Sequence, residues 1–173
     1  IGYDIRLSSP EISAALTRGL NEGGCEVFDL GLCGTEEVYF ATQHFAMDGG
    51  IAVTASHNPP DYNGMKFVRE ESRPISGDSG LLEIRDLAAA GDFTMAGAVG
   101  GMHELDARPA YVQHLLSYID PASLQPLKIV VDPGNGGAGL VVNALQPHLP
   151  FEFVKIHDQP DGTFPNGVPN PLL

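Results

Sequence analysis

The class of fold is indicated by Ile51-Ala52-Val53-Thr54-Ala55-Ser56-His57-Asn58-Pro59-Pro60-Asp61-Tyr62-Asn63-Gly64, an apolar run that passes directly into a polar loop. The first four residues have the β-branched character of a buried strand, and the proline, asparagine and glycine residues after them are turn signals. In open α/β sheets, ligands bind at the carboxyl ends of the strands. We therefore expect a strand over 51–54 and a ligand-facing loop over 55–64.

Helical patterns precede this strand. Apolar residues recur at helical spacing over 35–47, and Gly49-Gly50 separates that pattern from the strand. Further upstream, Ser8-Ser9-Pro10-Glu11 predicts a helix start, either with Ser9 as the cap before proline or as a Ser8–Glu11 capping box. Gly23-Gly24 predicts the end of that helix, and a strand over 25–30 follows. This alternation of helix and strand predicts an α/β layer fold.

The rest of the chain continues the alternation. We expect an extended segment over 65–68, helices over 79–90 and 108–119 with a glycine-rich loop over 91–101 between them, and a break at Asp120-Pro121. A second unit then follows, with a strand over 128–131, the turn 132–139, a helix to about Leu145 and a strand over 151–156. Two strands are too few for an independent sheet domain. We therefore expect one domain over 1–124 and an incomplete second one over 125–173, cut at Leu173.

Composition excludes several classes of function. The chain has 9 Lys and Arg residues against 22 Asp and Glu, a net charge of −13, which gives no general basis for tracking along nucleic acid. No apolar run approaches the ~20 residues of a membrane span, and the start is not a signal peptide, so we expect a soluble protein. Cys25 and Cys33 encode neither a disulfide framework nor a metal site, and a cytoplasmic location fits best.

A glycine-rich turn offers one possible ligand site. Gly134-Asn135-Gly136-Gly137-Ala138-Gly139 fits the dinucleotide-binding pattern after a strand and before a helix, and Asp158 follows at the required spacing. A noncatalytic sugar-phosphate or dinucleotide-binding module is therefore one hypothesis. Against it, Asp132 places a carboxylate where a pyrophosphate would lie, and such patterns arise easily among 21 glycines. A strand-to-helix turn with close backbone packing is the favoured interpretation.

The loop over 54–64 is chemically richer. It concentrates hydroxyl, imidazole and amide groups, and three of the nine cations, Lys66, Arg69 and Arg73, follow it directly. Because Arg and Lys bind phosphate through charge-assisted hydrogen bonds, this cluster predicts a local anion pocket. A solvated turn, with the charges interrupted by Glu70-Glu71, is the alternative. Ser56-His57 alone is not a hydrolase dyad, because the G-x-S-x-G elbow is missing.

These motifs resemble a known family. Residues 54–59 with 61–66 resemble the phosphoserine loop of the α-D-phosphohexomutases, and further similarities lie at 2–9, 34–42, 73–78, 133–139 and 161–171. Together they cover essentially the whole chain and are most similar to the bacterial phosphomannomutase branch. The resemblance implies a three-layer α/β/α mixed-sheet domain followed by an incomplete second domain of the same type. It also implies that the glycine-rich turn is structural.

The resemblance further implies an activity. Family members interconvert hexose 1- and 6-phosphates through a phosphoserine and a hexose 1,6-bisphosphate, and mannose 6-phosphate and mannose 1-phosphate are the expected pair here. Ser56 would be the phosphoserine, His57 would orient the loop, and Lys66 would transfer a proton or bind the moving phosphoryl group. The expected substrate-binding residues are Asn58, Asn63, Lys66 and Arg6, with loop bracing as the alternative role for Arg6.

Cofactors follow from the same resemblance. The family binds Mg²⁺ through a phosphoserine oxygen and three aspartates of a D-G-D-x-D-R loop, and it is activated by glucose or mannose 1,6-bisphosphate. That aspartate loop is missing here, so Ser56, through its phosphate, is the one expected metal ligand, and Asp161-Gly162-Thr163 is no substitute. The family's sugar-recognition and phosphate-clamp motifs are also missing. We expect this chain to be inactive alone, and the sequence leaves mannose or glucose preference and oligomeric state open.

Overall fold

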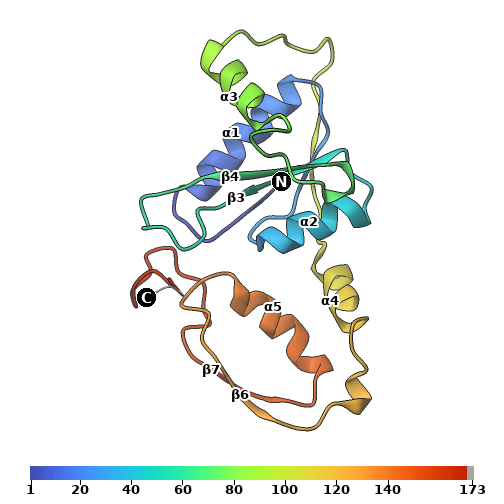
Figure 1. The fold of residues 1–173 in the computed structure, drawn as a ribbon, viewed down its shortest axis with the longest axis vertical. Coiled ribbons are helices and arrows are strands. Elements are labelled where there is room, and N and C mark those ends of the chain that lie inside the picture. Colours follow the sequence, from blue (N-terminus) through green and yellow to red (C-terminus); the bar gives the residue numbers. More distant parts are fainter. Residues whose placement is uncertain (171–173) are drawn as a thin grey trace.

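The computed structural model describes residues 1–170, so that Pro171 of the last motif and the expected cut at Leu173 lie outside the described residues. Figure 1 shows an upper unit built around a sheet and a lower unit joined to it by one helix. The elements, in chain order, are β1 (Gly2–Tyr3), α1 (Ser9–Glu22), β2 (Val27–Asp29), α2 (Thr35–His44), β3 (Gly49–Val53), β4 (Met65–Arg69), η1 (Glu70–Ser72), α3 (Leu81–Ala90), β5 (Met102–Glu104), α4 (Arg108–Leu116), η2 (Pro121–Ser123), β6 (Lys128–Val131), α5 (Ala138–Leu145), η3 (Gln146–His148) and β7 (Glu152–Lys155).

Strand β3 is the centre of the first unit. Strand β1 pairs with it in parallel, with Gly2 opposite Ala52, and β4 pairs antiparallel on its other side, with Met65 opposite Val53. The parallel pair β2 and β5 continues this arrangement, because Tyr3 donates its backbone N–H to Gly31 and accepts one from Cys33, just after β2. The sheet is therefore mixed, as expected.

Helices cover both faces of this sheet. Helix α1 lies on one face and α2 on the other, which gives the three-layer arrangement (Figure 1). Val38 of α2 packs with Cys33 and Ala52 in the core. Helix α2 approaches so closely that a Cβ added to Gly50 would overlap the Thr42 hydroxyl. The expectation of an α/β/α domain is confirmed.

Several local predictions were wrong in detail. Ser8 is the N-cap of α1 but its side chain makes no capping hydrogen bond, and Ser9 donates its hydroxyl to Asp4 instead, so neither predicted cap forms. Gly49-Gly50 does not separate helix from strand: both glycines belong to β3. Strands β1 and β5 were not predicted, since two or three residues carry too little periodicity to be recognised.

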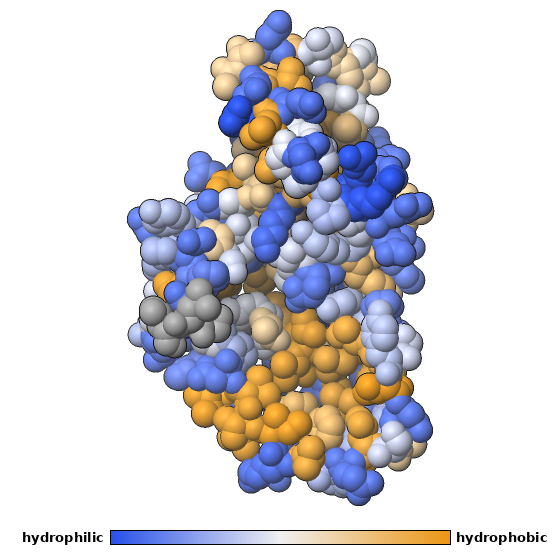
Figure 2. Space-filling view, viewed as in Figure 1, coloured by the Kyte–Doolittle hydropathy of each residue, from blue (hydrophilic) through white to orange (hydrophobic). Residues whose placement is uncertain are grey.

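The second unit is small. Strands β6 and β7 form a parallel pair, with Lys128 opposite Glu152, and α5 connects them. Apolar side chains gather on the surface of this unit (Figure 2), including the exposed residues Leu127, Val130, Val154 and Ile156. A sheet of two strands is too small to form a buried core of its own, so apolar side chains of this unit remain exposed to solvent.

Helix α4 joins the two units and is fastened to the first. Arg108 donates from Nε to the Glu37 carboxylate at 3.0 Å and from a terminal nitrogen to the Leu32 carbonyl at 2.8 Å. The same carboxylate accepts the N–H of Gly34 at 2.8 Å, and Glu37 is only 3% exposed. A buried carboxylate satisfied by an arginine and a backbone N–H thus ties the start of α4 to the start of α2. Within residues 1–170, no helix is long and apolar enough to cross a membrane.

Candidate functional site

The loop over 54–64 leads from β3 into β4 and has a fixed shape. Its base is closed by the Thr54 N–H, which donates to the Gly64 carbonyl at 2.9 Å. Asn58 donates both its backbone N–H and its side-chain amide to the Ala55 carbonyl, at 3.0 and 2.8 Å. Turns closed by such local hydrogen bonds keep a polar loop ordered without burying it.

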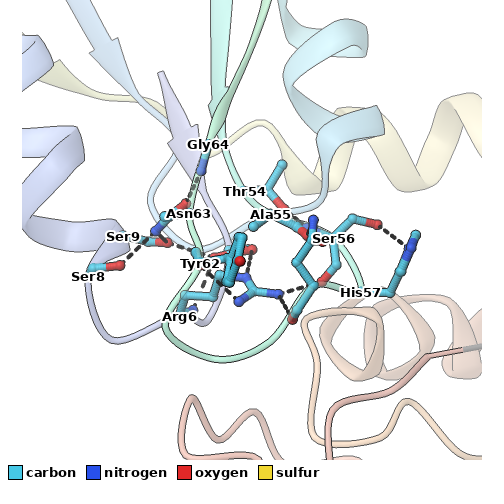
Figure 3. Close-up of polar contacts among 12 residues, drawn as sticks. Arg6, Ser8, Ser9, Thr54, Ala55, Ser56, His57, Tyr62, Asn63 and Gly64 are labelled. Atoms are coloured by element: carbon cyan, nitrogen blue, oxygen red, sulfur yellow. Dashed lines mark hydrogen bonds and ion pairs between the residues drawn. The ribbon is translucent and has the colours of Figure 1, made fainter.

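Ser56 projects from the exposed outer side of this loop (Figure 3). Its φ of 52° lies in the left-handed region, which costs a non-glycine residue roughly 1–2 kcal/mol and which the surrounding contacts must maintain. Its backbone N–H donates to the Thr54 hydroxyl at 3.0 Å, and its own Oγ lies 3.4 Å from Nδ1 of His57. The expected nucleophile therefore faces solvent beside an imidazole.

Arg6 supports the loop from beneath. Its terminal nitrogens donate to four backbone carbonyls of the loop, at 2.6 Å to Pro59, 2.9 Å to Tyr62, 2.8 Å to Ser56 and 2.6 Å to Asn58. Its Nε lies 3.3 Å from the Asp4 carboxylate, and the residue is 1% exposed. Of the two roles expected for Arg6, these contacts give it that of the brace, because its guanidinium is committed to the protein.

Asp4 and Asn63 tie the loop to the start of α1. Asp4 accepts the backbone N–H of Arg6 at 3.0 Å and the hydroxyl of Ser9 at 2.6 Å. Asn63 donates its side-chain amide to the hydroxyls of Ser8 and Ser9, each at 2.9 Å, while its carbonyl accepts the Gly64 N–H at 2.8 Å. Figure 3 shows the Asn63 side chain directed at Ser8 and Ser9 and the Arg6 guanidinium directed at the loop.

The predicted cluster of cations is only partly present. Lys66 lies opposite Ala52 in β4, two residues beyond the loop, and is exposed. Its side-chain ammonium takes part in none of the hydrogen bonds or ion pairs found within residues 1–170. The antiparallel course of β4 carries Arg69 to the far end of β3, opposite Gly49, roughly 13 Å along the strand from Val53. Arg73 is paired with Glu70. The prediction that all three cations form one pocket was therefore wrong, and Lys66 is the cation that stays near the loop.

The described residues do not form a metal site. Within 1–170, no three His, Cys, Asp or Glu side chains lie where they could together hold a metal ion. The set of donors near Ser56 therefore does not fit Mg²⁺ without the phosphate. Burial raises the pKa of the Cys33 thiol to about 12, with Glu37 adding to the effect, so this cysteine stays protonated and does not compete with Ser56 as a nucleophile.

The glycine-rich turn after β6 is covered by protein. Asn135 is 7% exposed, and its backbone N–H donates to the His157 carbonyl at 2.8 Å. A Cβ added to Gly139 would overlap the carbonyl oxygen of Asp158, and one added to Gly134 would press on Pro169. The glycines thus allow the chain after β7 to pack against the turn. This favours the structural interpretation over the dinucleotide-binding one.

The site also contains residues that sequence reasoning did not single out. Asp4 and Thr54 belong to the motifs quoted above, but their roles become visible only in the structure: Asp4 lies against the Arg6 guanidinium, and Thr54 accepts the Ser56 N–H. In the sequence, the one sign of this support is the Asp-x-Arg pattern at positions 4–6, in which a carboxylate can hold the arginine that binds the loop. Ser56 is exposed in a strained backbone conformation, and the buried Arg6 holds the loop that carries it. The site therefore presents the Ser56 hydroxyl to solvent.

Comparison with known proteins assigns the class. The family described as "Phosphoglucomutase/phosphomannomutase, alpha/beta/alpha domain I" matches residues 1–95, and domain II of the same family matches residues 109–173. The chain therefore belongs to the phosphoglucomutase/phosphomannomutase family. The second match begins inside α4, at residue 109.

Individual relatives sharpen the comparison. The chain is 58% identical to a protein named "Phosphohexose mutases" from Xanthomonas campestris and 52% identical to the phosphomannomutase of Escherichia coli, over its whole length. It spans 39–40% of the length of these curated relatives. A crystal structure of a phosphoglucomutase/phosphomannomutase family protein from Burkholderia thailandensis superposes with a TM-score of 0.88 at 35% identity, covering 99% of this chain and 38% of that one.

Proposed function

We propose that this chain provides the phosphoserine loop of a hexose-phosphate mutase, with mannose 6-phosphate and mannose 1-phosphate as the substrate pair. The observation that carries the proposal is the placement of Ser56, whose hydroxyl is exposed on a loop that Arg6 fixes through four carbonyls. The similarity of this chain to relatives named as phosphomannomutases supports the choice of mannose phosphates as substrates.

The proposed reaction has two transfers. Phosphorylated Ser56 passes its phosphoryl group to the free hydroxyl of a hexose monophosphate: the P–O bond to the serine breaks, a P–O bond to the sugar forms, and the proton of the sugar hydroxyl ends on the serine oxygen. The resulting 1,6-bisphosphate turns around and returns its other phosphoryl group to Ser56. In such transfers the protein contributes mainly positioning and charge, which suits a rigid loop.

Lys66 and His57 are proposed to assist. The ammonium of Lys66 is exposed near the loop and not engaged within residues 1–170, so it can neutralise a phosphoryl group or exchange a proton. His57 lies against the Ser56 hydroxyl and can orient it. The side-chain amides of Asn58 and Asn63 already donate hydrogen bonds within the protein. Their proposed contact with substrate would use the hydrogen-bonding positions of these side chains that those bonds leave unoccupied. Mg²⁺ would take one ligand from this chain, a phosphate oxygen on Ser56, and we assign no step to it.

The direct test is phosphate uptake. The chain is incubated with glucose 1,6-bisphosphate and Mg²⁺, and its intact mass is measured. We expect the mass of one added phosphoryl group in the native chain and in Ser117→Ala, which removes an exposed hydroxyl at the end of α4, but not in Ser56→Ala. Equal uptake by Ser56→Ala, or no uptake by the native chain, contradicts the proposal. Thermal stabilisation by NAD that is lost in Gly136→Ala would instead support the dinucleotide-binding alternative.

Turnover is tested in a hybrid protein. Residues 1–173 replace the matching stretch of the Xanthomonas campestris relative, and conversion of mannose 1-phosphate is followed by a coupled assay. We expect the hybrid to be active, its Ser56→Ala variant to lose about 10³-fold or more of kcat, and the isolated chain to show no turnover. Turnover by the isolated chain near that of the hybrid would overturn the expected inactivity.

A further inference from the structure

One segment of the second unit reaches across to the first. Gly162 is buried against the backbone of Ile5, so closely that a Cβ at position 162 would overlap the Ile5 carbonyl oxygen and approach the Leu7 side chain to 3.1 Å. Residues 5–7 surround Arg6, the brace of the Ser56 loop. The segment 161–167 therefore lies directly against the residues that position the expected nucleophile.

Phe164 is the side chain through which this segment meets Arg6. The guanidinium carbon lies 5.7 Å from the centroid of the Phe164 ring, within the ~6 Å at which a cation is attracted to an aromatic face. Phe164 is 8% exposed and the Arg6 side chain is fully buried, so water screens this contact little. The arginine is thus held by loop carbonyls through its edges and covered by an aromatic ring.

The backbone around Phe164 is arranged to hold the ring in place. Phe164 has a φ of 48°, a left-handed conformation that a bulky residue keeps only when its surroundings enforce it. Its N–H donates to the Asp161 carbonyl at 3.0 Å, and its carbonyl accepts the Gly167 N–H at 2.9 Å. The Asp161 carboxylate in turn accepts the backbone N–H and the hydroxyl of Thr163, at 2.9 and 2.7 Å.

The glycine-rich turn anchors this segment. The backbone carbonyl of Asn135 accepts the Asp161 N–H at 2.8 Å, and its side-chain carbonyl accepts the amide of Asn166 at 2.9 Å. Its side-chain amide donates to the Gln159 carbonyl, also at 2.9 Å. One buried asparagine thus fixes the segment on both sides of Phe164. The turn that resembles a dinucleotide site has its polar groups directed at residues 157–166 instead.

We propose that Phe164 is a positioning residue for the Ser56 loop, acting through Arg6. The ring covers the guanidinium and keeps its four donors directed at the loop carbonyls, so that the order of the loop depends on the second unit. This inference deepens the proposed function, since positioning matters for phosphoryl transfer only if Ser56 carries the phosphate. The contact between the two units stands independently of that chemistry.

Hydrogen exchange in the 173-residue chain tests the positioning. Removal of the ring in Phe164→Ala is expected to speed exchange of the hydrogen-bonded loop amides of Thr54, Asn58 and Tyr62 by about tenfold, while amides within α2 keep their rates. Phe164→Tyr keeps an aromatic face and is expected to restore the native rates. Phe153→Ala removes a ring in contact with Phe151 of the same unit, away from Arg6, and serves as the matched control.

A second variant guards against misfolding of the first. Gly162→Ala adds one methyl group that must push the segment away from Ile5, and it is expected to speed exchange of the same loop amides. Gly137→Ala, whose Cβ would meet no atom within 4 Å, is the control. Unchanged loop exchange in folded Phe164→Ala and Gly162→Ala overturns the inference, and so does an equal acceleration in Phe153→Ala.

Phosphate uptake separates this inference from the proposed function. With glucose 1,6-bisphosphate and Mg²⁺, we expect Phe164→Ala to phosphorylate Ser56 about tenfold more slowly than the native chain, and Phe164→Tyr at the native rate. If the native chain takes up no phosphate, the proposed function fails, while the exchange data still decide whether Phe164 orders the loop. If all variants are phosphorylated at the native rate, the positioning role is refuted and the proposed function stands.

Discussion

The chain contains two polar loops that follow parallel strands, and they differ in what lies around them. The loop after β3, residues 54–64, is exposed on its outer side and supported from beneath by Arg6. The loop after β6, residues 132–139, is covered by the chain that follows β7 and has a buried asparagine at its centre. Both lie where α/β folds bind ligands.

This difference shows that the position of a loop at the end of a strand does not by itself make it a site. Both loops use left-handed residues, Ser56 at 52° and Asn135 at 62°. At Ser56 the side-chain hydroxyl is exposed, whereas the side-chain amide of Asn135 is directed inward, to the Gln159 carbonyl and the Asn166 amide of the segment that follows β7. The Ser56 hydroxyl of the first loop is exposed to a ligand, whereas the Asn135 amide of the second loop is used by the fold.

The largest expected effect comes from removing the support of the first loop. Arg6→Ala leaves four carbonyls without their donor and is expected to lower the free energy of unfolding by about 3 kcal/mol or more, measured by urea denaturation. The control Arg85→Ala removes an exposed arginine paired with Asp86 and should change stability by less than about 0.5 kcal/mol. If Arg6→Ala lowers the free energy of unfolding by less than about 1 kcal/mol, the loop keeps its shape without the arginine.

A smaller effect is expected from crowding the second loop. Gly139→Ala places a methyl group against the Asp158 backbone and is expected to cost about 1–3 kcal/mol, seen as a lower midpoint of urea unfolding. Gly137→Ala, in open space two residues earlier, should be tolerated. If both variants are equally stable, the covering segment is not packed as tightly as the contacts indicate, and the contrast between the loops weakens.

The smallest effect concerns the carboxylate before the first glycine of the second loop. The Gly134 N–H, and then His157, hold the pKa of Asp132 below its ordinary value of 3.8. Because the folded pKa is the lower one, this stabilisation is complete above the ordinary value and is lost as the pH falls through the folded pKa. Asp132→Asn should therefore lower Tm slightly at pH 7, with the difference from the native chain shrinking toward pH 3.

The control for that titration is Asp92→Asn, a change of an exposed aspartate in a loop of the first unit. It is expected to leave the dependence of Tm on pH as it is in the native chain. An Asp132→Asn difference that does not shrink as the pH falls below 3.8 would mean that the carboxylate makes no stabilising contact in the turn.

Much of the fold could be predicted because its signals are local. The helix that begins at Ser9 and the strand over 128–131 are marked by proline and by β-branched residues within the segments themselves. Strand β5 could not be found, because its three exposed residues become a strand only by pairing with β2. The Gly49-Gly50 pair was assigned to a break, whereas both glycines lie in β3: α2 leaves no room for a side chain at Gly50, and the Val68 carbonyl of β4 crowds Gly49.

The site divides in the same way. Ser56 and Lys66 lie in one continuous motif, and the pairing of β3 with β4 places Lys66 opposite Ala52, beside the base of the loop that carries Ser56. The separation of Arg69 from the loop depends on the antiparallel direction of β4, which nearness in sequence conceals. Phe164 could not be linked to Arg6 by any local pattern, because the two residues are 158 positions apart in the chain and their contact requires the second unit to fold back.

The attachment of α4 restricts how the two units can move. Arg108 binds the buried Glu37 at the very start of the helix, and Tyr111, one turn later, packs against Phe40 of α2. A rotation that began before α4 would have to expose a carboxylate that is 3% accessible. Helix α4 also packs against α5 of the second unit, so any opening between the units is expected to separate α4 from either α2 or α5.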